Sequence, residues 1–209
     1  MRRRLLPLLL LIASPAYAGF EGVTMCYHAA GGACTDTVID QPTIDASASH
    51  AVGHLNKCVS TTLVPTSSYV LDAVSIELAT ITGCDGNITG YIYSSAAGDS
   101  EGAPDDLVAT ADSVKSCATI TGAACATDRT ILTFNFTGVT IPNNGAYQFV
   151  MCFDGSDVNY FLACGDGAIT DAYGVYTRAT LPPGAADDVA NWTEADVNGG
   201  SRWKTYNCQ

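Results

Sequence analysis

The sequence predicts an all-β fold, a two-sheet antiparallel β-sandwich of jelly-roll type that disulfides stabilise. Several runs alternate apolar and polar side chains with a period of two, which is typical of half-buried strands. Clusters of Gly, Asp, Asn, Ser and Pro separate these runs, and no segment keeps a 3.6-residue period over several turns. Short strands with turn signals between them favour a sandwich over a helical or α/β fold.

The N-terminus has the three parts of a secretory signal peptide. Three arginines follow Met1, an apolar run spans 5–13, and Ala16-Tyr17-Ala18 fits a signal-peptidase site. The apolar run is shorter than the ~20 residues that a membrane span needs. We therefore expect a signal peptide over 1–18 and a chain that is secreted, periplasmic or held at the cell surface, without membrane insertion.

The rest of the chain divides by composition at about residue 58. Residues 19–57 are rich in Gly, Ala, Ser, Thr and Asp, and we expect a loop-rich N-terminal segment there. Residues 58–209 carry the alternating runs and form the predicted β-sandwich domain. The expected strands span 69–78, 87–94, 107–114, 131–136, 146–153, 158–163, 173–178 and 201–206.

The run 131–136 shows the alternation most clearly. Leu132, Phe134 and Phe136 point one way, while Thr133 and Asn135 point the other. The same period places Tyr147, Phe149, Met151 and Phe153 on one face of the next run, and Val74, Ile76 and Leu78 on one face of an earlier run. Facing residues of two sheets would bury these side chains together.

The negative charge of the chain limits the classes of molecule that it can bind. The net charge is −12, and cleavage of the signal peptide would remove three of the nine basic residues and no acidic residue. Proteins bind nucleic acid by neutralising phosphates with Lys and Arg, so we exclude a nucleic-acid partner. Neutral glycans, extracellular surface components and divalent cations remain as candidate partners.

All nine cysteines follow the signal peptide, and none forms a C-x-x-C pair, so disulfides are favoured over zinc or haem. Two pairs bracket short Gly/Ala loops, a third would face across a hairpin, and a fourth would join the first and last strands. The expected pairs are Cys26–Cys34, Cys117–Cys125, Cys152–Cys164 and Cys58–Cys208. Cys84 is then left free or available for an intermolecular bond.

A set of short motifs supports the jelly-roll prediction. They are the run from Tyr69 to Leu78, Tyr91-Ile92-Tyr93 with Gly102-Ala103-Pro104, the run from Thr133 to Ile141, Tyr147-Gln148-Phe149-Val150, and Trp192 with 202–206. In this order they resemble the choice-of-anchor jelly-roll modules of bacterial secreted and surface proteins, over about residues 59–207. The resemblance implies a fold and an extracellular setting, and it implies no activity.

Aromatic residues near the C-terminus are candidates for sugar binding, because flat rings stack on sugar rings. The candidates are Trp192, Tyr160, Tyr173 and Tyr176. Trp192 lies in the polar stretch 187–198, so we expect it to be exposed. Aromatic residues also fill sandwich cores, and this alternative stays open.

Two groups of residues are candidates for metal binding. Asp154, Asp157, Asp166 and Asp171 crowd acidic loops that would suit calcium, although solvated turn residues give the same pattern. On a helix, His50, His54 and Cys58 would share a face that could hold zinc or copper. Gly53 weakens such a helix, and loop histidines are the alternative.

The chain has no recognised catalytic motif, such as G-x-S-x-G. We therefore expect a secreted non-catalytic module that binds a glycan or a surface ligand, with calcium as an optional cofactor. One alternative is a structural subunit of an extracellular coat, filament or matrix that self-associates. The other is a secreted hydrolase with an unrecognised site.

Overall fold

The computed structural model describes the core of the chain and several surrounding strands. The described residues are 34–40, 48–52, 57–63, 65, 67–80, 84–95, 102–125, 127–143, 145–156, 161–166, 175–180, 191–196, 200–201 and 203–208. The outer strands β1, β2 and β13 are described by their backbone, as are most residues of β10, β12 and β14 and the first two residues of β11.

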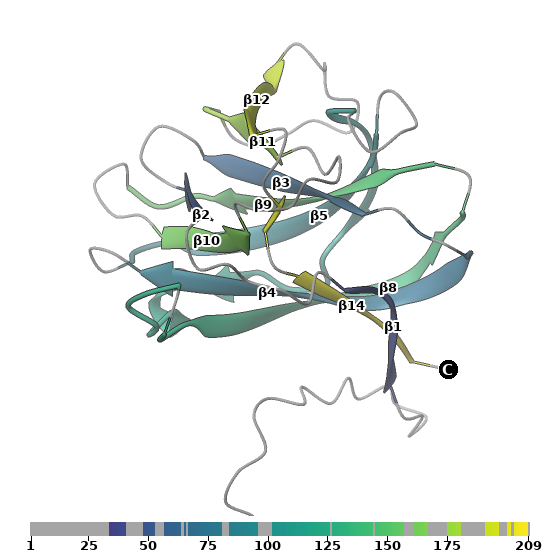
Figure 1. The fold of residues 1–209 in the computed structure, drawn as a ribbon, viewed down its shortest axis with the longest axis horizontal. Coiled ribbons are helices and arrows are strands. Elements are labelled where there is room, and N and C mark those ends of the chain that lie inside the picture. The colour runs from purple at the N-terminus through teal and green to yellow at the C-terminus, as the bar shows by residue number, and fades with distance from the viewer. Residues whose placement is uncertain are drawn as a thin grey trace, which may run out of the picture.

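The described strands form two antiparallel sheets, which Figure 1 shows as stacked layers. Sheet A has the order β1-β14-β4-β10-β13, with β8 paired to β4 and β2 paired to β10. Its strands are β1 Cys34–Asp40, β2 Ala48–Val52, β4 Tyr69–Thr80, β8 Thr130–Ile141, β10 Phe161–Asp166, β13 Gly200–Ser201 and β14 Trp203–Cys208.

Sheet B has the order β12-β11-β3-β9-β5-β6, with β7 paired to β5. Its strands are β3 Cys58–Leu63, β5 Asn87–Ser95, β6 Pro104–Thr110, β7 Lys115–Ser116, β9 Tyr147–Phe153, β11 Val175–Arg178 and β12 Thr193–Asp196. A single turn of 3-10 helix, η1, spans Cys117–Thr119. The predicted all-β fold with two antiparallel sheets is confirmed, while the jelly-roll connectivity stays a prediction.

The expectation of a loop-rich segment over 19–57 is wrong for part of that range, because β1 and β2 lie within it. The sequence of β1 contains the β-branched residues Thr35, Thr37, Val38 and Ile39, which suit a strand. Its strand state depends on pairing with β14, near the other end of the chain, at the register pair Cys34 and Cys208. Local composition carries little signal for a strand that a distant partner completes.

The hydrophobic core lies between the two sheets. Phe134 and Phe136 of β8 meet Phe149 of β9, with ring centroids 5.6 and 6.5 Å apart. Val74, Ile76 and Leu78 of β4 belong to the same buried cluster. The predicted inward faces of these three strands are therefore confirmed.

A β-bulge between β4 and β8 shifts the phase of burial along β4. Leu71 is paired with Val139 and Ala73 with Asn135, so two steps on β4 correspond to four on β8. Gly138 lies inside the bulge with φ of +71°, a conformation that glycine adopts without strain. As a result, Leu71 and Val74 both reach the core although they are three residues apart.

Three disulfides lie among the described residues: Cys58–Cys152, Cys84–Cys117 and Cys125–Cys164. Cys58 and Cys152 are register partners in the β3–β9 ladder, with their Cα atoms 4.1 Å apart. Cys125 and Cys164 pack with Ala79 in a small cluster of their own.

These bonds correct four of the expectations for cysteine. Cys84 is bonded to Cys117, so it is neither free nor intermolecular, and Cys117 does not pair with Cys125. The expected hairpin bond Cys152–Cys164 does not form, because Cys152 lies opposite Cys58 in the β3–β9 ladder and is bonded to it, while Cys164 is bonded to Cys125. Cys58–Cys208 is wrong as well, because Cys58 is bonded to Cys152. The expected pair Cys26–Cys34 includes Cys26, which lies outside the described residues.

Replacing Gly90 by Ala should destabilise the core. A Cβ atom there would lie 2.9 Å from Cδ1 of Phe134 and 3.2 Å from Cε2 of Phe149. Overpacking of this kind costs about 1–3 kcal/mol, which denaturant unfolding would measure. Gly138→Asn is the control, because nothing lies within 4 Å of its Cβ position and Asn tolerates positive φ. An equal loss in the two variants would contradict the packing argument.

Stability should fall at high pH because of Tyr69. Burial raises the pKa of this tyrosine to about 12, and the Thr205 hydroxyl opposes part of that rise. The unfolded tyrosine ionises near pH 10, so the contribution to stability is complete below that pH and is lost as pH rises toward 12. Between pH 9 and 11 we expect a loss of about 1 kcal/mol from this group. Tyr69→Phe should remove that part of the pH dependence in denaturant unfolding, and an unchanged slope would contradict the assignment.

Candidate functional site

The outer face of sheet B, on the side away from the core, carries aromatic and polar side chains in register. The alternation that sends Ile88 and Ile92 into the core turns Thr89, Tyr91 and Tyr93 outward. Across β3, β9 and β5 the outward positions form three rows: Thr62–Gln148–Tyr93, Ser60–Val150–Tyr91 and Cys58–Cys152–Thr89. Every residue of β3 and β9 is buried, so part of this face is covered.

Gln148 is the centre of a buried polar layer on this face. The residue is 0% exposed, and its Nε2 donates to Oγ1 of Thr62 at 2.9 Å and to the carbonyl of Gly102 at 2.7 Å. Ser95 Oγ donates to the same carbonyl at 3.0 Å. Two side chains of sheet B thus fasten the chain just before β6 onto the sheet. The Oε1 of Gln148 is buried and has no hydrogen-bond partner within the described part of the chain.

Trp192 is 7% exposed, so the expectation that it is an exposed sugar platform is wrong. It belongs to a buried cluster that also contains Val150 and the bonded Cys58 and Cys152. The guanidinium of Arg178 lies 5.9 Å from the centre of its ring. The polar sequence around Trp192 gave no sign of this burial, because the contacts come from β3 and β9.

The three tyrosines that were sugar-binding candidates together with Trp192 have no described side chains. Tyr176 is on β11, where its register partner is Glu194 of β12. Tyr160 and Tyr173 lie outside the described residues. Their part in binding stays a prediction.

Tyr91 is an aromatic residue that the site prediction missed. It is partly buried against the cluster that contains Trp192, and its ring centroid lies 6.3 Å from that of Tyr93. Thr89 is on the same face of β5, and the exposed Thr110 of β6 is the register partner of Tyr91. We call Thr89, Tyr91 and Thr110 the tyrosine patch. The alternation of residues 87–94 could have revealed this face, because it separates the isoleucines from the tyrosines.

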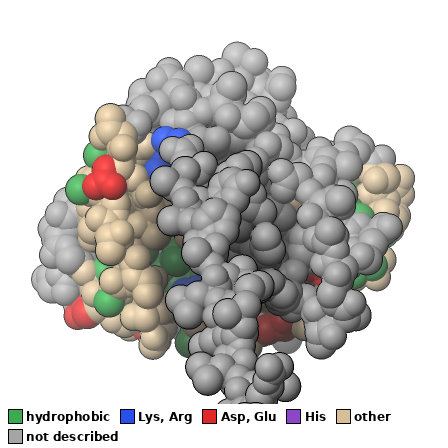
Figure 2. Space-filling view, turned by 90° about the horizontal axis from the view of Figure 1, so that it is seen from below, with side chains coloured by type: hydrophobic (Ala, Val, Ile, Leu, Met, Phe, Trp, Pro, Cys, Tyr) green, Lys and Arg blue, Asp and Glu red, His purple; other side chains and the backbone are tan. Residues whose placement is uncertain are grey.

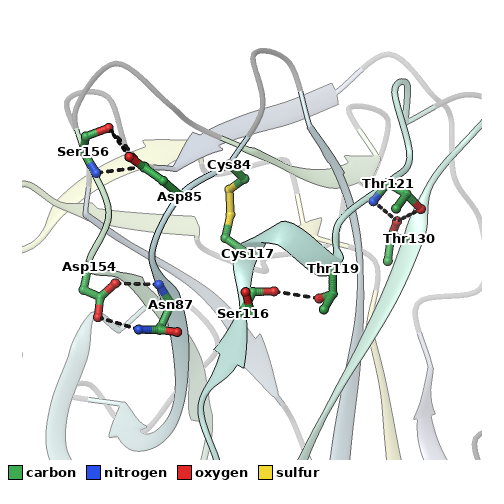
Figure 3. Close-up of a disulfide and its surroundings, with 10 residues drawn as sticks. All are labelled: Cys84, Asp85, Asn87, Ser116, Cys117, Thr119, Thr121, Thr130, Asp154 and Ser156. Atoms are coloured by element: carbon green, nitrogen blue, oxygen red, sulfur yellow. Dashed lines mark hydrogen bonds between the residues drawn. A yellow bond between two sulfur atoms is a disulfide. The ribbon is translucent and has the colours of Figure 1, made fainter.

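Two acidic turns at one end of the sandwich bind each other, as Figure 3 shows. Asp154 accepts from the backbone N–H of Asn87 at 2.5 Å and from its side-chain amide at 3.3 Å. Asp85 accepts from the N–H of Ser156 at 3.2 Å and from its hydroxyl at 3.0 Å. We call these four residues the loop clasp. The adjacent disulfide joins Cys84 to Cys117.

The loop clasp is packed against the sheet as well. Lys57 Nζ donates to the carbonyl of Gly155 at 2.8 Å and lies 5.7 Å from the centre of the Phe153 ring. A Cβ atom on Gly155 would collide with the carbonyl oxygen of Asp85, so the close approach of the turns requires glycine. These contacts give the two aspartates a structural role.

The residues expected to bind calcium are not brought together in the described part of the chain. Asp154 is in the loop clasp, and Asp166 ends β10 with its side chain undescribed. Asp157 and Asp171 lie outside the described residues. Among the described residues, no group of three or more His, Cys, Asp or Glu is placed to hold a metal ion. Figure 2 views the molecule from below the orientation of Figure 1, and the described acidic side chains on this face lie at separate places.

The candidate zinc or copper site also loses one ligand. His50 lies on the strand β2, opposite Ala163 of β10, and so is not on a helix. Cys58 is bonded to Cys152 and has no thiolate to offer. His54 lies outside the described residues.

No protein family, curated protein or solved structure with which the chain was compared matches it. Among the described residues, no helix is both long and apolar enough to cross a membrane. The resemblance to choice-of-anchor modules therefore stays a prediction.

Removing the amide of Gln148 should loosen the covering of sheet B. Gln148→Leu loses the donor to Thr62 and Gly102, and we expect the free energy of unfolding to fall by about 1–3 kcal/mol. Thr140→Val is the control, because Thr140 is exposed on β8 and should change stability by less than about 0.5 kcal/mol. Denaturant unfolding measures both. A Gln148→Leu variant as stable as the wild type would show that the amide does not hold this layer.

Proposed function

We propose that the protein is a secreted, non-catalytic module that binds a neutral glycan at the tyrosine patch. The observation that carries the proposal is the half-buried ring of Tyr91, held by packing on one side and flanked by the side chains of Thr89 and Thr110.

The chemistry of this patch suits a sugar ring. A pyranose has an apolar C–H face, which stacks on an aromatic ring, and hydroxyls at its edge, which need donors and acceptors. Each threonine hydroxyl can both donate and accept. Packing of Tyr91 against a buried cluster fixes the ring before binding, which lowers the entropic cost of association.

Charge favours a neutral glycan over an acidic one. The chain has a net charge of −12, and the exposed Asp106 lies on β6, the strand that also carries Thr110 of the patch. A uronic acid or sulfated sugar would approach against this field. The proposal requires no calcium, so chelation by EDTA should leave binding unchanged.

The alternative of a coat or filament subunit built by strand exchange needs an open sheet edge. On one side of the sandwich, β6 and β8 each pair with one neighbour among the described strands. Asp112 joins them, because its N–H donates to the carbonyl of Asn135 and its carboxylate accepts from Thr137 Oγ1 at 2.8 Å. Bulges and acidic residues disfavour the addition of another strand at such edges.

Screening of the oxidised protein on a glycan array tests the proposal, followed by titration of the best neutral ligand. Tyr91→Ala should weaken binding at least about tenfold, because a stacked aromatic ring contributes ~1 kcal/mol or more beyond its area. Tyr91→Trp should preserve binding, since it keeps a flat ring.

Ile131→Ala is the matched control, because Ile131 is 48% exposed on sheet A and lies outside the patch. Equal affinity of Tyr91→Ala and the wild type would overturn the assignment of the site. Absence of binding to every neutral glycan would overturn the function itself. Thermal unfolding of each variant separates loss of binding from loss of fold.

A further inference from the structure

We infer that Cys34 and Cys208 form a fourth disulfide, which joins the first and last described strands of the chain. The two residues are Cα partners in the antiparallel β1–β14 ladder. This pairing differs from the sequence-based expectation, in which Cys34 pairs with Cys26 and Cys208 with Cys58.

The register supplies the geometry. Directly opposite residues of an antiparallel pair have Cα atoms about 4.5 or 5.5 Å apart, depending on the hydrogen-bonding pattern at that position. Both separations fall within the range of about 4.4–6.8 Å in which disulfides form. Cys34 and Cys208 therefore need no rearrangement of the backbone to be bridged.

The same protein contains a cross-strand disulfide of this kind. Cys58 and Cys152 are register partners of β3 and β9, and they are bonded. A pair of cysteines that lie opposite one another in a ladder therefore already forms a disulfide in this fold. The Cys34–Cys208 pair repeats it at the edge of sheet A, and Figure 1 shows the C-terminus beside β1.

Counting the cysteines supports the assignment. The chain has nine, and the three described disulfides use six of them. Cys26, Cys34 and Cys208 remain, so one intramolecular bond at most can form among them. The ladder places Cys34 opposite Cys208, which leaves Cys26 as the odd cysteine.

The bond forms by thiol–disulfide exchange with an exported thiol–disulfide oxidoreductase, or with oxidised glutathione in vitro. The thiolate of one cysteine attacks the disulfide of the oxidant and gives a mixed disulfide, and one sulfur of the oxidant leaves as a thiolate. The second cysteine then attacks the protein sulfur of the mixed disulfide and releases the other. The two cysteines lose two electrons and two protons, and the oxidant gains them as two thiols.

Peptide mapping of the oxidised full-length protein without reduction tests the inference. Free thiols are first blocked by alkylation in denaturant, and chymotrypsin then cuts after Tyr27, which separates Cys26 from Cys34. The expected result is one linked peptide that contains Cys34 and Cys208. Bonds from Cys26 to Cys34 or to Cys208, or alkylation of both Cys34 and Cys208, would overturn the inference.

The stability of cysteine variants gives a test of the bond that is independent of peptide mapping. Cys34→Ser and Cys208→Ser should each lower Tm by about 5–10 °C, because a disulfide that closes a long loop is lost, and the double variant should lose no more than either single. Cys26→Ser is the matched control and should leave both Tm and the Cys34–Cys208 peptide unchanged. Additive losses in the double variant, or a loss of the linked peptide in Cys26→Ser, would contradict the bond.

Discussion

The structure depends on the β3–β9 ladder, which is buried on both faces at every position. One face of this ladder forms the core with Phe134 and Phe136 of sheet A, and the other face lies beneath Trp192. The Cys58–Cys152 disulfide fixes the register of the ladder from its outer side. A one-residue slip would turn Phe149 outward and bring Gln148 into the core, so the whole sandwich requires this register.

The two faces of the ladder are stabilised by different interactions. The inner face is apolar and gains from the removal of hydrocarbon from water. The outer face buries Ser60, Thr62 and Gln148, which must be hydrogen-bonded or they would cost more than they contribute. Gln148 meets this demand in part by holding the carbonyl of Gly102. The polar layer therefore specifies where the loop before β6 lies, and through it where β6 presents Thr110 beside Tyr91.

The sequence predicts some parts of this structure well and others poorly, for physical reasons. Period-two alternation is a local property, so the inward faces of β4, β8 and β9 were predicted correctly. Disulfide pairing depends on which residues the fold brings together, and Cys152 lies opposite Cys58, which is far away in the sequence, while Cys164, close in sequence, is bonded to Cys125. Burial of Trp192 depends on β3 and β9, far away in the chain, while its own neighbours are polar. Tyr91 lay within a predicted strand, but only the register with Thr110 showed that it belongs to a patch.

The few cations of this acidic chain bear on what the protein can bind. Lys57 is used between Gly155 and Phe153, and Arg178 lies on Trp192. Arg129 pairs with Glu77 at 2.5 Å on the outer side of sheet A and donates to the carbonyl of Cys125, beside the Cys125–Cys164 disulfide. Each of these cations joins a loop or turn to a sheet. Because these three cations serve internal contacts, the glycan binding that we propose for the tyrosine patch would rest on stacking and hydroxyl groups, which are the interactions that a neutral sugar offers.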